Sequence, residues 1–155
     1  MRKFTLEELR QRAFLRAAWV LWHYWEEQQY DIKLDGTRQD ARVHSRLFDP
    51  LVPDIHITIG TSKKGGGHKE HLVPCVVLRD QAFAMFWDNK TVEDVAEMLE
   101  KFLRIAHINP EEARHLDHKL KLKKVMPEGW SFESGSVMDR LKVGGIELVS
   151  TNSND

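Results

Sequence analysis

The chain has 155 residues, 41 % of them hydrophobic, which is enough for one compact domain with its own core. Its 23 basic and 24 acidic residues leave a net charge of −1, so a nucleic-acid partner would have to be held by local basic patches. The single cysteine, Cys75, excludes an internal disulfide and fits a reducing compartment.

The N-terminal segment "MRKFTLEELRQR" is charged and lacks the apolar core of a signal peptide. The longest apolar run of the following helix is far shorter than the ~20 residues that a membrane span needs. We therefore expect a soluble, cytoplasmic protein without a membrane partner.

The first predicted element is a long helix. Thr5 and Glu8 form a capping-box pattern, and two adjacent apolar stripes with helical spacing continue to about Gln29. Between residues 13 and 25 the helix is apolar on most sides, which favours a central position in the domain and leaves open a homodimer through this helix. Tryptophans with helical spacing are more typical of a core or interface than of a ligand cage, and here they are Trp19, Trp22 and Trp25.

Strands are predicted next. Asp35-Gly36 is a turn signal, and residues 30–34 before it and 41–47 after it alternate as strands do. Residues 54–60 alternate apolar and polar side chains and predict a further strand, while the glycines at 65–67 predict a loop.

The rest of the chain is mostly helical in pattern. Helices are expected over 75–87, over 92–107 after a cap at Thr91, and over 111–120 after Asn109-Pro110. Residues 119–124 alternate lysine and leucine, a last short helix is expected over 137–143, and residues 146–149 predict a final strand. These elements predict an α+β fold with a small antiparallel sheet, one compact domain over residues 1–149, and a polar tail over 150–155.

One short segment carries a functional signature. "HKEHLVPC" contains Glu70 and His71, followed by two apolar residues and Pro74, and this pattern resembles the signature of the HNH, or His-Me finger, nucleases. The resemblance covers about five residues and implies a ββα unit in which His71 deprotonates the water that attacks a phosphodiester. It also implies that Glu70 helps to hold a divalent metal ion of the Mg or Zn class.

His115 and His118 are the second metal-binding candidates. They are three residues apart on a predicted helix, so both imidazoles could reach one cation. The bland alternative is a solvated short helix whose polar residues point outward.

Several basic residues are candidates for contacts with phosphate. Arg42 and Arg46 would share one face of a predicted strand, although ion pairs with the nearby Asp40 and Asp49 are the simpler explanation of this pattern. The loop before Glu70 adds Lys63, Lys64 and His68. The densest basic patch follows the histidines, and it predicts either contact with a nucleic-acid backbone or protection of an edge strand: Lys119, Lys121, Lys123 and Lys124.

Two functions of different classes follow. One is a small metal-dependent HNH-like nuclease, either active or diverged and inactive, with His71 as general base and with Glu70 and His115 or His118 as metal ligands. The other is a non-enzymatic inhibitor or adaptor from a phage or mobile element, which would bind a larger protein or nucleoprotein target. The tryptophan-rich first helix favours the second function, because aromatic residues are enriched in interface hot spots.

Overall fold

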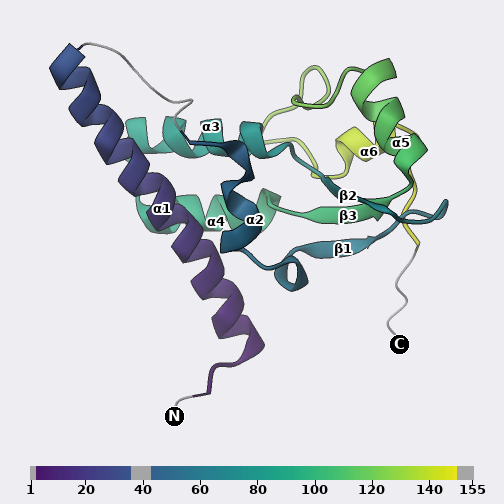
Figure 1. Cartoon of the computed structure of the whole chain (residues 1–155), viewed down its shortest axis with the longest axis horizontal. Coiled ribbons are helices and arrows are strands. Elements are labelled where there is room, and N and C mark those ends of the chain that lie inside the picture. Colours follow the sequence, from purple (N-terminus) through teal and green to yellow (C-terminus); the bar gives the residue numbers. More distant parts are fainter. Residues whose placement is uncertain (1–2, 36–42, 150–155) are drawn as a thin grey trace. The chain divides into compact units, whose positions relative to one another are not determined.

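The computed structural model describes residues 3–35 and 43–149, and the side chains of residues 3–30 and 43–149. It confirms an α+β fold with a long N-terminal helix, α1 (Leu6–Asp35), and a small sheet (Figure 1). The chain forms two compact units, one built from residues 1–56 and 75–101 and the other from residues 57–74 and 102–155. No helix in the described ranges is both long and apolar enough to cross a bilayer.

The first unit is helical. After α1 come the short helices η2 (Ser45–Leu47), α2 (Phe48–Leu51) and η3 (Asp54–His56), and then α3 (Cys75–Trp87) and α4 (Val92–Phe102). One side of α1 is fully buried and packs against α2 and α3, through Ala13, Phe14, Ala17, Ala18 and Leu21.

The opposite side of α1 is open. Trp19 is 44 % exposed and Tyr30 is 64 % exposed, so α1 is not surrounded by protein on all sides. The predicted central position of this helix is therefore wrong. Of the three helical tryptophans, Trp25 packs against aromatic rings of α3, with its ring 5.7 Å from the buried Phe86 and 5.6 Å from the exposed Trp87.

The second unit contains a mixed three-stranded sheet of β1 (Thr58–Thr61), β2 (His68–His71) and β3 (Ile105–Ile108), in the order β1-β3-β2. β2 pairs antiparallel with β3, whereas β1 pairs parallel with β3, so the small sheet is mixed rather than purely antiparallel. β3 is central, and its apolar side chains are fully buried, as is typical of a strand covered on both faces. The helix predicted over 92–107 is therefore too long: α4 ends at Phe102, because residues 105–108 form β3.

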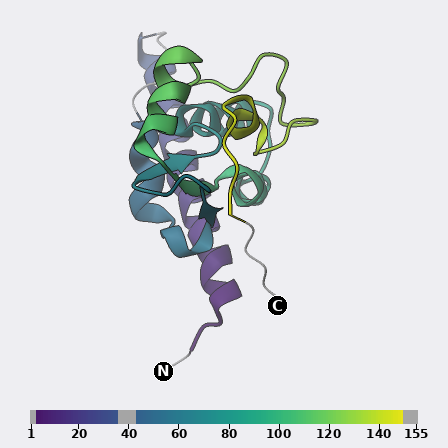
Figure 2. The same cartoon turned by 90° about the vertical axis from the view of Figure 1, so that its right-hand side faces the viewer.

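Short helical pieces complete the second unit. Asn109 caps the N-terminus of α5 (Pro110–Arg114), as the Asn-Pro pair predicts, and it forms a capping box with Glu112. A π-helical turn, η4 (His115–Lys119), follows it, and an irregular path leads to α6 (Asp139–Val143) (Figure 2). The core of this unit consists of Leu72, Ala106, Ile108, Ala113, Leu116, Leu122, Leu141 and Ile146.

Several predicted strands are wrong. Residues 30–34 continue α1, because extending a helix that is already formed is easier than starting a strand. The described part of 41–47 forms the turn of η2, where the His44 side chain accepts a hydrogen bond from the Arg46 amide. The strand predicted over 54–60 begins only at Thr58.

Two further strand predictions, at the C-terminal side, also differ from the structure. In the alternating segment 119–124, Lys119 ends η4 and residues 120–124 are irregular, so no edge strand exists there for the lysines to protect. Residues 146–149 contribute a single bridge between Leu148 and Ser62. The predicted turn at Gly36 and the tail over 150–155 lie outside the described residues.

Candidate functional site

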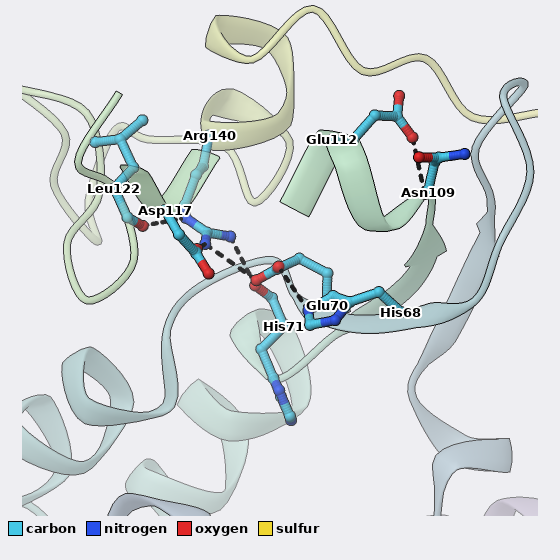
Figure 3. A network of polar contacts seen from close by, with 8 residues as sticks. All are labelled: His68, Glu70, His71, Asn109, Glu112, Asp117, Leu122 and Arg140. Atoms are coloured by element: carbon cyan, nitrogen blue, oxygen red, sulfur yellow. Dashed lines mark hydrogen bonds and ion pairs between the residues drawn. The ribbon is translucent and has the colours of Figure 1, made fainter. Parts of the chain in front are cut away.

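Arg140 of α6 is the centre of a polar network in the second unit (Figure 3). Its side chain is 1 % exposed, and its Nη2 lies 3.0 Å from Oε2 of Glu70. Its Nη1 donates to the backbone oxygen of His71 at 3.0 Å, and its Nε donates to the backbone oxygen of Leu122 at 2.6 Å. A buried guanidinium is tolerated when it is paired and hydrogen-bonded in this way, and here it joins α6, β2 and the chain after η4.

Glu70 is bound by protein groups at both of its carboxylate oxygens. One oxygen faces Arg140, and the other lies 3.2 Å from Nε2 of His68. The Glu70 side chain is only 10 % exposed. The predicted metal ligand is therefore, in this structure, the acidic partner of a buried ion pair.

His71 lies at the end of β2, as the HNH resemblance implies, but on the other side of the strand from Glu70. Neighbouring side chains in a strand point to opposite faces, and Figure 3 shows the His71 imidazole directed away from Glu70 and Arg140. His71 as a residue is half-buried and takes part in a further interaction besides the one that its backbone oxygen makes with Arg140. The predicted base and the predicted ligand are adjacent in sequence but do not converge.

The glycine loop between β1 and β2 is held at its start. The Ser62 hydroxyl is buried and donates to Glu112 Oε2 at 3.0 Å. The Lys64 amide donates to Ser62 Oγ at 3.1 Å, and the Asn109 side chain donates to the Lys64 oxygen at 3.2 Å. The capping box of α5 therefore also fixes the loop that leads into β2.

The two loop lysines have different surroundings. Lys63 Nζ donates to Glu147 Oε2 at 2.8 Å, and this bond lowers the pKa of the Glu147 carboxyl. The charge of Lys63 is thus compensated, whereas Lys64 is exposed and joins the hydrogen bonds of the loop through its backbone amide and oxygen.

His115 and His118 lie on η4, where His115 is half-buried and His118 is exposed. The structure does not bring either of them together with Glu70 and a third ligand. Among residues 3–30 and 43–149, no group of three or more histidine, cysteine, aspartate or glutamate side chains is placed to hold a metal ion.

Residues 114–124, named here the basic segment, carry several exposed positive charges in the second unit. The segment contains five lysines and arginines but one acidic residue, Asp117. Oδ1 of Asp117 lies 3.9 Å from Nη2 of the buried Arg140, so this carboxylate pairs with Arg140 and not with the exposed lysines. No ion pair is found within the described residues for the segment's five cationic side chains, which are all exposed: Arg114, Lys119, Lys121, Lys123 and Lys124.

A hollow of about 320 Å³ lies between residues 127–135 and α6. Its charged lining residues are Glu128, Asp139 and Lys142, and Trp130 forms part of its wall. With two carboxylates and one ammonium group, this hollow offers no net attraction for phosphate.

The predicted arginine pair is not assembled as expected. Arg46 is exposed on η2 in the first unit, so it does not stand on a strand face. Arg42 lies outside the described residues.

Arg140 is the site residue that sequence reasoning missed. The sequence places it on a short helix beside Leu141, where an arginine is ordinarily solvated. The burial of Arg140 could be predicted only from its acidic partner. That partner, Glu70, is 70 residues earlier, and no local sequence pattern links the two.

Comparisons with known proteins return no match to a family model, a curated protein or a solved structure. The functional argument therefore rests on the residues and the geometry described above.

Proposed function

We propose that this protein binds the phosphate backbone of double-stranded nucleic acid through the basic segment and does not cleave it. The observation that supports this proposal is the row of exposed cationic side chains between Arg114 and Lys124 whose charge no carboxylate among the described residues compensates. Phosphate contacts from lysine and arginine supply most of the affinity in binding that is independent of sequence.

The backbone of the basic segment is anchored, which favours binding. Leu116 and Leu122 are buried, and the Leu122 amide donates to the Leu116 oxygen at 2.8 Å. Lys121 between them has a φ of 57°, a left-handed conformation that reverses the chain and that few residues other than glycine adopt. Arg140 holds the Leu122 oxygen from behind. An anchored backbone loses little conformational entropy when it meets its ligand.

A duplex suits the basic segment better than a single strand does. Residues 114–124 contain no phenylalanine, tyrosine or tryptophan, so the segment lacks the large aromatic side chains on which unpaired bases stack best. A duplex presents one negative charge for every ~1.7 Å of its axis, which a row of cationic side chains can exploit without reading sequence.

The position of Glu70 supports the part of the proposal that excludes cleavage. Its carboxylate is already neutralised by Arg140 and faces away from His71, so the acid and the base of the HNH-like signature do not act on one ligand. In this proposal Glu70 is a structural residue that stabilises β2 beside the basic segment.

Binding is tested by fluorescence anisotropy with a labelled random-sequence duplex of about 20 base pairs, at several salt concentrations. The test variant is Lys119→Gln/Lys123→Gln/Lys124→Gln, and the matched control with the same charge change is Lys3→Gln/Lys90→Gln/Lys101→Gln. We expect the test variant to lose most of the duplex affinity and the control to keep it. Equal losses in the two variants, or no wild-type binding at low salt, would overturn the proposal.

Hydrolysis at His71 is the second candidate function. The observation that favours it is the order of elements, because His71 ends β2 and α3 begins four residues later at Cys75, as a strand-to-helix nuclease motif requires. Its test is incubation of labelled duplex with Mg²⁺ or Mn²⁺. Metal-dependent cleavage that His71→Ala abolishes and His118→Ala leaves unchanged would establish a nuclease and refute binding without cleavage.

A further inference from the structure

The exposed side of α1 carries an aromatic pair. Trp19 lies on the helix face opposite the buried Ala17 and Leu21, and its indole is 44 % exposed. The Trp22 ring meets the Trp19 ring edge-on, with 5.4 Å between the ring centroids. Large aromatic surface left open to water in this way is typical of an interface.

Charges flank this pair symmetrically. Arg12 precedes Trp19 by seven residues, and Glu26 follows it by seven. Seven residues are close to two helical turns, so the three side chains share one face of α1. The Arg12 guanidinium stacks on the Phe4 ring at 4.2 Å, and Glu26 lies 3.9 Å from the exposed His23, so neither charge is buried in an internal ion pair.

We propose that this face binds the same face of a second copy of the chain, with the two α1 helices antiparallel and the two-fold axis at Trp19. Antiparallel pairing places Arg12 of each copy opposite Glu26 of the other, and it brings the two Trp19 side chains together on the axis. Each ion pair is formed twice, as a self-complementary interface requires.

Other arrangements fit the charges less well. Two parallel helices would oppose Arg12 to Arg12 and Glu26 to Glu26, which is repulsive. The face from Arg12 to Glu26 is only ~21 Å long at ~1.5 Å per residue, so the contact is smaller than a standard interface. The expected dimer is therefore reversible, with a dissociation constant on the order of micromolar.

The test is sedimentation equilibrium of the full chain at about 5 to 500 µM, because this range brackets a micromolar dissociation constant. We expect a monomer–dimer equilibrium that Trp19→Ala weakens at least about tenfold, as loss of a hot-spot aromatic does. Arg12→Glu and Glu26→Arg should each weaken self-association. An equimolar mixture of the two charge variants should associate again, because the reversed charges are then complementary. Lys90→Glu, a charge reversal at an exposed residue of the loop between α3 and α4, is the control and should leave the equilibrium unchanged.

Three outcomes would overturn the inference. The first is a monomer over the whole concentration range. The second is a dimer that Trp19→Ala does not weaken. The third is a pair of charge variants that are each impaired but fail to restore association when mixed, which would assign the face to a different protein. Circular dichroism of every variant ensures that a loss of association is not a loss of folding.

Discussion

The ion pair between Glu70 and Arg140 gives the sharpest prediction about stability. Arg140→Met removes one member of a pair in which the arginine is 1 % and the glutamate 10 % exposed. It also leaves the backbone oxygens of His71 and Leu122 without their donor. Breaking a buried ion pair from one side typically costs about 3–5 kcal/mol. We expect about 4 kcal/mol for Arg140→Met, with His68 retained as a partner of Glu70.

Glu70→Met should cost less than Arg140→Met, because Arg140 then keeps its two carbonyl acceptors. The double variant should be more stable than the sum of the two single effects implies, by roughly 1–3 kcal/mol, since it leaves no unpaired buried charge. Urea unfolding followed by circular dichroism gives the three free energies of unfolding. Additive effects within about 0.5 kcal/mol would refute the reasoning, because independent side chains add in this way.

Three further predictions concern local structure. Asn109→Ala should reduce the free energy of unfolding by about 1 kcal/mol, because it removes the cap of α5, and thermal unfolding measures the loss. Asp94 accepts the Thr91 amide, which lowers the pKa of the Asp94 carboxyl, so its contribution is present above the ordinary aspartate pKa and is lost as the pH falls through the lowered value. Asp94→Asn should therefore lower the melting temperature at pH 7, and the two melting curves should converge in strong acid. Gly144→Ala should destabilise the chain by about 1–3 kcal/mol in the urea assay, because its Cβ would lie 2.7 Å from Leu116; an unchanged midpoint would contradict the close packing of α6.

The parts of the fold that depend on local signals were predicted from the sequence. Thr5, Thr91 and Asn109 each mark the start of a helix, because a cap acts within its own turn. The β3 strand was missed, since a short apolar run fits a helix or a buried strand equally well. Its place between β1 and β2 depends on pairing with segments more than 30 residues earlier.

The candidate site shows the same division. The exposure of Lys119 and Lys121 follows from their alternation with two leucines, because Leu122 lies in the core and Leu120 packs against it. The role of Glu70 does not follow from its neighbours, because its partner is a buried arginine on a distant helix. Sequence reasoning assigned this carboxylate to a metal ion because it could not see Arg140.

The most direct test of the central claim is the salt dependence of duplex binding by the wild type and the triple lysine variant. If the five cationic side chains of the basic segment each neutralise one phosphate, the slope of log K against log salt is about −4.5 at ~0.9 per contact. The variant keeps two of these charges, so its slope should fall to about −1.8. The same slope for both proteins would contradict the claim that residues 114–124 contact the backbone.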